Sequence, residues 1–166
     1  MAQILITSTI AAPIETVFDV ARDIGFHQES LRHTSERAVA GRTDGLIELS
    51  ETVTWRARHL GVWWTLTSRV TELSPPELFV DEQVAGPFRS FRHEHRFQAL
   101  PQGTLMIDDW RHVAPLGWLG QLVDGVVLRR WMERVLSTRA AAIAQEAERR
   151  ATSLRCSRAS RTGRSP

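Results

Sequence analysis

Residues Phe79 to Pro115 read FVDEQVAGPFRSFRHEHRFQALPQGTLMIDDWRHVAP, a stretch that predicts three consecutive β-strands separated by two turns. The turns are marked by Gly86-Pro87 and by Pro101-Gln102-Gly103, because glycine admits unusual φ angles and proline cannot continue a central strand. The middle strand alternates, and one of its faces carries Phe91, His93, His95 and Phe97. Two histidines are therefore expected between two phenylalanines on the face that should be buried.

The residues on either side of this stretch extend the pattern to a whole domain. An alternating β-branched segment predicts a first strand from Gln3 to Ile10, and an apolar stripe after Pro13 predicts a short helix to about Asp23. A second short helix is expected from Phe26 to Arg32. Turn residues then divide an antiparallel meander into strands expected at Ser35–Ala40, Leu46–His59, Val62–Leu73, Leu78–Val84, Phe88–Leu100 and Thr104–Val113.

The hydrophobic period changes after Pro115. Apolar residues from Leu119 to Ile143 recur three and four positions apart, which predicts a long C-terminal helix with one apolar face and a bend near Gly125. The meander is the surface that such a face can cover, so we expect an α+β domain in which a curved antiparallel sheet of about seven strands surrounds this helix. That geometry tends to leave an apolar cavity, the usual kind of small-molecule site.

Composition limits the class of protein and its compartment. The chain has 166 residues, enough for one domain, and a single cysteine, Cys156, which rules out an intrachain disulfide framework. The start, Met1 to Ile4, has no positively charged region before an apolar run, so we expect a cytoplasmic protein without stable membrane insertion. We expect a monomer or a homodimer.

The charge is concentrated at the C-terminus. Residues 149–166 hold six arginines and no acidic residue, so residues 1–148 are net acidic although the whole chain carries a formal charge of +2. All basic residues are arginines, and this composition indicates codon bias more than a surface selected for phosphate binding. No nucleic-acid partner is therefore expected. We expect a ligand-binding domain over 1–148 and a disordered Arg/Ser-rich tail over 149–166.

Two strand registers are possible around Gly86-Pro87. If these two residues form the whole loop, Glu82 shares a face with His93 and could exchange protons with it. A loop longer by one residue would place Asp81 and Gln83 on that face instead. The alternative to a catalytic pair is a structural hydrogen-bond network at the cavity.

Other kinds of site have weaker support. His93 and His95, with Glu82 and either Asp108 or Asp109, could supply nitrogen and oxygen ligands to zinc. However, the sequence has no HExxH motif and no cysteine cluster, so neither a metal site nor a cofactor is expected. Phosphate-binding loops and the motifs of covalent nucleophiles are also missing.

Several motifs together resemble the START-like, or SRPBCC, helix-grip superfamily, which includes lipid-transfer domains and the polyketide cyclase and dehydrase group. The motifs are Ile10-Ala11-Ala12-Pro13-Ile14-Glu15-Thr16-Val17-Phe18, Phe79-x-Asp81-x-Gln83-x-x-Gly86-Pro87-Phe88, Phe91-x-His93-x-His95-x-Phe97, Gly103-Thr104 with Asp108, and Pro115-x-Gly117 before a helix with Arg139. Within it, the chain is most similar to uncharacterised bacterial ligand-binding SRPBCC proteins. His112 and Phe91 depart from that subgroup, where tyrosine and tryptophan are more usual. The resemblance implies the fold, but such folds serve carriers, sensors and enzymes alike.

The resulting hypothesis is carriage or sensing of a hydrophobic small molecule, such as a lipid, a polyketide or an aromatic metabolite. The alternative is a cyclase or dehydratase without a covalent nucleophile, in which His93 and Glu82 or Asp109 move protons. Six tryptophans suggest an aromatic-lined pocket or simply a large core. The residues expected at the cavity are Trp63, Trp64, Val80, Glu82, Phe91, His93, Asp109, Arg111 and Trp131, with Gly86 and Pro87 at its rim.

Overall fold

The computed structural model describes residues 2–59, 61–114 and 128–162. Its elements, in chain order, are β1 (Ala2–Ile10), α1 (Ile14–Ala21), α2 (Ile24–Ser30), a 3₁₀ turn (Arg32–Thr34), β2 (Arg37–Gly41), β3 (Thr52–His59), β4 (Val62–Ser74), β5 (Leu78–Ala85), β6 (Ser90–Leu100), β7 (Gly103–Val113) and α4 (Arg129–Thr162). All of the predicted strands and both short helices are present, with ends shifted by a few residues. The largest shift is in β3, which begins at Thr52 and not at Leu46.

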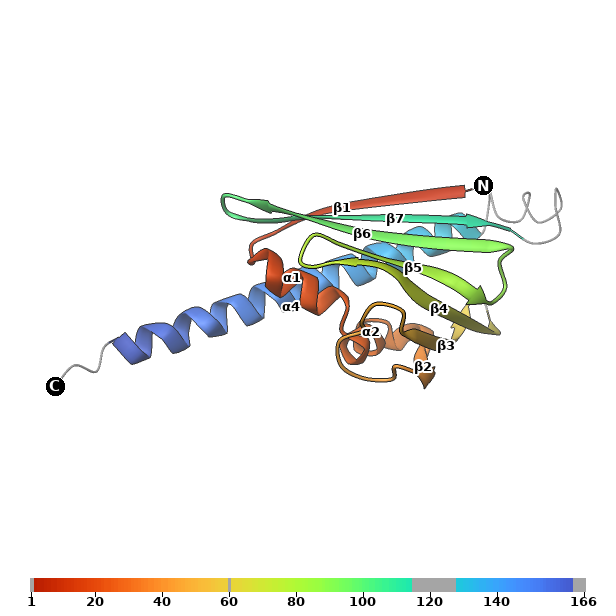
Figure 1. The fold of residues 1–166 in the computed structure, drawn as a ribbon, viewed down its shortest axis with the longest axis horizontal. Helices are drawn as coiled ribbons and strands as arrows, with labels where there is room; N and C mark the ends of the chain where they lie inside the picture. Colours follow the sequence, from red (N-terminus) through yellow and green to blue (C-terminus); the bar gives the residue numbers. More distant parts are fainter. Residues whose placement is uncertain (1, 60, 115–127, 163–166) are drawn as a thin grey trace.

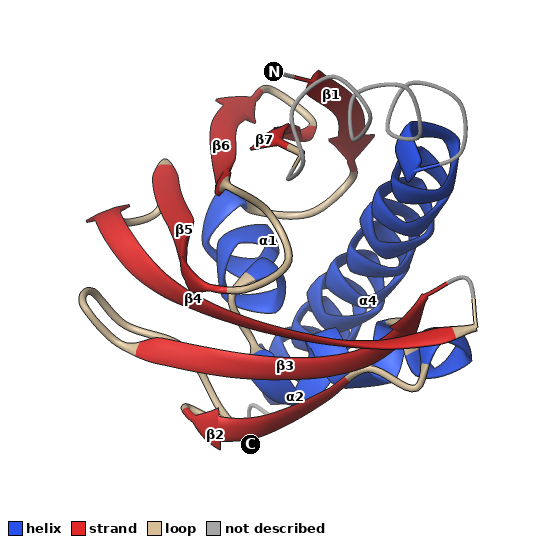
Figure 2. Cartoon of the chain, turned by 90° about the vertical axis from the view of Figure 1, so that its right-hand side faces the viewer, coloured by secondary structure: helices blue, strands red, loops and turns tan. Residues whose placement is uncertain are grey.

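The seven strands form one antiparallel sheet in the order β1-β7-β6-β5-β4-β3-β2. The long helix α4 runs across the sheet, as Figure 1 shows. Seen along the helix, the sheet curls from β1 to β2 around α1, α2 and α4 (Figure 2). The predicted α+β helix-grip architecture is therefore confirmed.

The main core lies where α1 and α4 cross the sheet. Phe18 of α1 packs edge-on against Phe79 and Phe97, with ring centroids 5.8 and 5.5 Å away. Ile143 of α4 is fully buried in the same cluster. These apolar side chains close one part of the concave side of the sheet, so the space that remains lies toward α2 and the β3–β4 hairpin.

Helix α4 ends later than the sequence predicts. It continues to Thr162, and Ala151 is buried in the main core one helical turn after Ala147. The hydroxyls of Thr152 and Ser153 donate to the carbonyls of Glu148 and Arg149, four residues earlier, so these polar side chains bond within the helix. The structure thus describes residues 149–162 as helix, where the sequence predicts a disordered tail.

The predicted first part of this helix, Leu119–Val126, and its bend near Gly125 lie outside the described residues. So do Trp118 and the Pro115-x-Gly117 motif. Within the described ranges, no helix combines the length and apolar character needed to cross a membrane.

Candidate functional site

A cavity of about 510 Å³ lies between the concave face of the sheet and the helices. Its lining is mostly apolar: Trp55, Leu66 and Val70 come from β3 and β4, while Met132 and Leu136 come from α4. Strands contribute alternate residues to it, because only every second side chain of a strand faces the concave side. The predicted apolar cavity is thus present.

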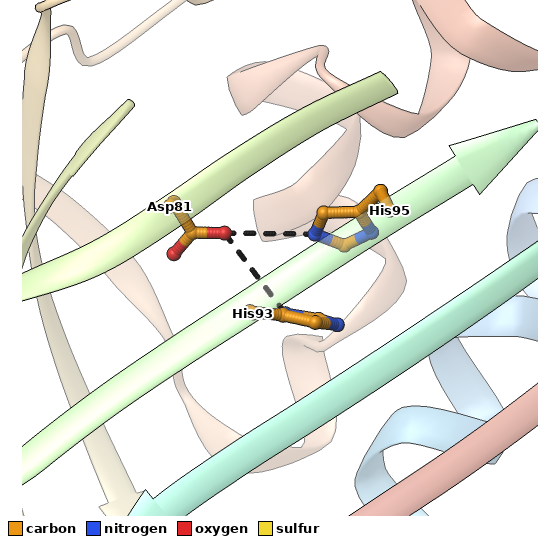
Figure 3. A group of neighbouring side chains, drawn as sticks. All are labelled: Asp81, His93 and His95. Carbon is orange, nitrogen blue, oxygen red and sulfur yellow. Dashed lines mark ion pairs between the residues drawn. The ribbon is translucent and has the colours of Figure 1, made fainter. Parts of the chain in front are cut away.

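Four ionisable side chains of three neighbouring strands form a polar group on this wall. Asp81 of β5 lies directly opposite His93 of β6, and His95 of β6 lies directly opposite Asp108 of β7. Since paired residues share a face, all four point to the concave side. Asp81, His93 and His95 line the cavity, and Figure 3 shows the Asp81 carboxylate directed at both imidazoles. We call these four residues the His–Asp cluster.

The two carboxylates lie on either side of the histidines. His95 Nδ1 contacts Asp108 Oδ1 at hydrogen-bond distance, while His95 Nε2 lies 3.5 Å from Asp81 Oδ1. His93 Nδ1 lies 4.0 Å from Asp81 Oδ1, and His93 Nε2 lies 3.6 Å from Asp108 Oδ1. The last distance is longer than a hydrogen bond, and His93 Nε2 is buried without a hydrogen-bond partner.

Burial and charge give the two histidines opposite protonation tendencies. Burial, together with the positive charge on His95, lowers the pKa of His93 to about 4, so this imidazole is neutral at pH 7. Burial also disfavours charge on His95, but the adjacent Asp108 and Asp81 carboxylates outweigh it and raise the pKa of His95. The two histidines in turn hold the pKa of Asp108 well below its usual range despite burial.

Arg139 of α4 is a second polar feature of the cavity wall. The residue is 7% exposed, and its guanidinium donates a hydrogen bond of 2.7 Å from Nη2 to the carbonyl of Ala21. In the described part of the chain, no carboxylate lies within ion-pair distance of it, and its Nε has no hydrogen-bond partner. Buried cations usually have such partners, so this guanidinium is available to a polar group in the cavity.

A third polar feature is the pair formed by His27 of α2 and Glu36, which both line the cavity. His27 Nε2 lies 2.7 Å from Glu36 Oε1, and the His27 ring stacks on Trp55 with centroids 4.1 Å apart. Burial lowers the pKa of His27, and the nearby Arg139 charge adds to this effect. The polar lining thus falls into separate groups on a mainly apolar surface.

The register between β5 and β6 decides which carboxylate faces the histidines. Asp81 lies opposite His93 and Glu82 lies opposite Arg92, so the longer of the two loops that the sequence allows is the one present. The side-chain amide of Gln83 holds this loop by bonding to the backbone carbonyl and N–H of Phe88. Glu82 therefore points away from the cavity and pairs with Arg92 at 3.6 Å, and its predicted role beside His93 is wrong.

The structure separates the residues expected at the cavity into two groups. Trp64, Phe91, His93 and the rim residue Pro87 line it. The other expected residues, which do not line it, are Trp63, Val80, Glu82, Gly86, Asp109, Arg111 and Trp131.

Strand alternation explains most of these misses. Trp63 directly precedes Trp64 on β4, and neighbouring side chains of a strand point to opposite faces, so Trp63 faces outward; it is 51% exposed and lies under the Arg56 guanidinium. Val80 and Asp109 are buried on the convex face, where Asp109 bonds to Arg111. The proposed proton transfer between His93 and Asp109 is therefore excluded, because the two side chains lie on opposite faces.

Sequence reasoning missed Arg139 and His27 as cavity residues. Arg139 was noted only as part of a family motif, and its spacing on α4 from Val135 and Leu136 was the signal that it shares the covered face. His27 lies on a helix of seven residues, too short for a clear apolar stripe. His95 was placed on the buried face but was not included among the site residues.

Comparison with known proteins places this geometry in a family. The family model described as polyketide cyclase / dehydrase and lipid transport matches residues 1–148. No curated protein matches the chain.

Solved structures share the fold at low sequence identity. The protein TTHA0849 from Thermus thermophilus is 16% identical, with a TM-score of 0.72 over 88% of this chain and 97% of its own. The ZhuI aromatase/cyclase from Streptomyces sp. R1128 is 22% identical, with a TM-score of 0.70 over 90% and 94%. The major latex-like protein 151 from Panax ginseng is 9% identical, with a TM-score of 0.62 over 88% and 97%. With the family match over residues 1–148, the chain belongs to the polyketide cyclase / dehydrase and lipid transport family.

Proposed function

We propose that the protein binds a hydrophobic small molecule with aromatic character and at least one polar oxygen, in the cavity between the sheet and α4. The observation that carries this proposal is the cavity itself, about 510 Å³ in volume and lined mainly by apolar side chains. This volume lies in the range of about 300–1,000 Å³ that is typical of small-molecule sites.

The lining supports a flat, oxygen-bearing ligand over a purely aliphatic one. Trp55, Phe91 and Trp110 offer aromatic surfaces, against which planar molecules pack well. Arg139 of α4 and His93 of β6 place buried, unpaired nitrogen atoms in the lining of the same cavity, and leaving them so is costly unless a ligand or water bonds to them. The family description, which covers polyketide cyclases and lipid transport, agrees with such a ligand.

Filling the cavity should weaken the binding of a fluorescent aromatic probe. Met132 lines the cavity from α4, so Met132→Trp reduces the space without removing a polar group. We expect the Kd of 1-anilinonaphthalene-8-sulfonate to rise at least about tenfold, a loss of about 1.4 kcal/mol. Fluorescence titration measures this, and native mass spectrometry of the freshly purified protein checks for a ligand that already occupies the cavity.

The matched control is Ser137→Trp, an exposed position on the same helix. It should leave the Kd within about twofold of the wild-type value, since it adds the same side chain outside the cavity. If the wild type does not bind the probe saturably, or if both variants bind it equally well, the cavity is not the binding site.

The His–Asp cluster favours a second function, proton transfer on a bound carbonyl compound, as in a cyclase or dehydratase. The neutral His93 imidazole could accept a proton, and the charged groups around it could stabilise the product of that transfer. On a polyketide-like β-dicarbonyl substrate, His93→Ala should lower turnover about a hundredfold or more. The control His33→Ala changes an exposed histidine and should not alter turnover. Unchanged turnover in the His93 variant would leave binding as the sole function.

A further inference from the structure

We propose that Asp81, His93 and His95 form a binding site for a divalent transition-metal ion that is open to the cavity. These residues supply one carboxylate oxygen and two imidazole nitrogens, and their ligand atoms all lie within 4.8 Å of one another. Figure 3 shows the three side chains converging from β5 and β6. The proposal concerns a site for an ion and does not depend on which organic molecule the cavity binds.

Asp108 influences which ring nitrogen of each histidine carries hydrogen and which keeps a free lone pair. Its Oδ1 bonds to His95 Nδ1, which therefore carries the hydrogen, and its charge 3.6 Å from His93 Nε2 favours a hydrogen on that nitrogen as well. In neutral rings, the remaining nitrogens, His95 Nε2 and His93 Nδ1, are then bare. Both of these face the same oxygen, Asp81 Oδ1, at 3.5 and 4.0 Å. A carboxylate behind a metal-binding histidine is the usual outer-shell arrangement of protein metal sites.

The distances are close to those of an occupied site. Ligand atoms bound to tetrahedral zinc at about 2.0–2.2 Å lie about 3.3–3.6 Å apart. The Asp81–His95 contact of 3.5 Å already lies in this range, and the Asp81–His93 contact of 4.0 Å reaches it if the two side chains move together by less than about 1 Å. Asp81 is only partly buried, with 21% of its side chain exposed, so it is the least confined of the three ligands.

The local charge also favours a cation. With neutral imidazoles, the cluster contains the carboxylates of Asp81 and Asp108. The Arg139 guanidinium acts on Asp81 only from beyond ion-pair distance, and it bonds to the backbone of Ala21. Asp108 is buried and Asp81 is partly buried, and a divalent ion would give these two carboxylates more positive charge than a single imidazolium can. Nitrogen donors together with one carboxylate favour zinc, cobalt, iron or nickel over magnesium or calcium.

Three protein ligands leave at least one coordination position free. Asp81, His93 and His95 all line the cavity, so that position faces the space in which a small molecule would lie. A bound ion could therefore hold a water molecule or a ligand oxygen, as open metal sites do. The polar wall of the cavity would then bind an ion of its own, beside the organic molecule of the proposed function.

The test uses the full chain without a polyhistidine tag and the metal ion alone. After treatment with EDTA and removal of the chelator, calorimetric titration with Zn²⁺ should show one saturable site per chain. Titration with Co²⁺ should give visible absorption bands of bound cobalt that Zn²⁺ removes. Zn²⁺ should also raise the midpoint of thermal unfolding, because an ion that binds only the folded protein stabilises it.

Variants decide which residues bind the ion. His93→Ala and His95→Ala should each weaken Zn²⁺ binding at least about a hundredfold and abolish the cobalt bands, more than the loss expected from an outer-shell change. His33→Ala, which removes an exposed histidine, should retain full binding. Circular dichroism establishes whether each variant is folded, and Asp81→Asn provides a third ligand variant that keeps the side-chain shape.

The proposal is overturned if the wild type shows no saturable Zn²⁺ site or if the folded ligand variants bind Zn²⁺ as the wild type does. Binding of 1-anilinonaphthalene-8-sulfonate is measured in the same samples with EDTA present. A protein that binds the probe but not Zn²⁺ contradicts the metal site alone, and one that binds Zn²⁺ but not the probe contradicts the proposed function alone.

Discussion

Asp108→Asn is expected to lower the free energy of unfolding by about 3–5 kcal/mol, since removing one member of a buried charged network leaves the others uncompensated. Asp108 is almost fully buried and faces both histidines of the cluster. Asparagine keeps the shape of the side chain but removes the charge that favours protonated His95. Equilibrium unfolding in urea at pH 7, followed by tryptophan fluorescence and with EDTA present, measures the change.

The control for this prediction is Glu82→Gln. Glu82 is also a strand carboxylate of the β5–β7 region, but it faces outward, is 43% exposed and pairs with Arg92. Exposed ion pairs contribute about 0–1 kcal/mol, so this variant should stay within that range. A similar small change for both variants would mean that the His–Asp cluster does not contribute to stability.

The architecture could be predicted from local patterns. The alternation of Phe91, His93, His95 and Phe97 placed all four on the covered face of one strand, and all four are buried there. Strand alternation and turn residues are local patterns that show where strands begin and end. In antiparallel hairpins, strands that follow one another in the chain also pair with one another, so these patterns predict the order of the sheet. This is why the order of strands and helices was correct while only element ends moved.

The identity of the acid beside the histidines could not be predicted. A shift of one residue between β5 and β6 exchanges Asp81 for Glu82 and turns the whole strand over. The loop that fixes the register depends on hydrogen bonds from the Gln83 side chain to Phe88, which no periodicity reveals. The sequence left both registers open, and the carboxylate that it favoured beside His93, Glu82, belongs to the register that is not present.

Contacts between residues that lie far apart in the chain could not be predicted from sequence patterns either. Arg139 bonds to the carbonyl of Ala21, 118 positions earlier in the chain, and the two lie together only because α4 packs on α1. Likewise, Glu36 reaches His27 through the fold of the segment after α2. Side chains at such crossings are set by tertiary packing, so the polar features of the cavity were found only in part.

The packing of α1 against the sheet gives the second prediction, for Phe18→Ala. Phe18 is 1% exposed, and its ring meets Phe79 and Phe97 edge-on in the main core. Truncating a buried phenylalanine costs about 3–5 kcal/mol, because the transfer energy is lost and a void remains. We expect a loss of this size in the free energy of unfolding, measured by urea denaturation.

The contrast with Leu5→Ala tests the reason for this loss. Leu5 is also apolar, but it is 59% exposed on β1, so its truncation should change stability by less than about 0.5 kcal/mol. The natural cavity borders the same Phe79 ring that Phe18 contacts. If the Phe18 variant loses less than about 1 kcal/mol, the side chains around the cavity must relax into the void, and the cavity would not be a rigid feature of the fold. The other outcome is a loss of about 3–5 kcal/mol in the free energy of unfolding, while the folded fraction still binds the probe. It would mean that the core at α1 stabilises the fold without determining the shape of the cavity.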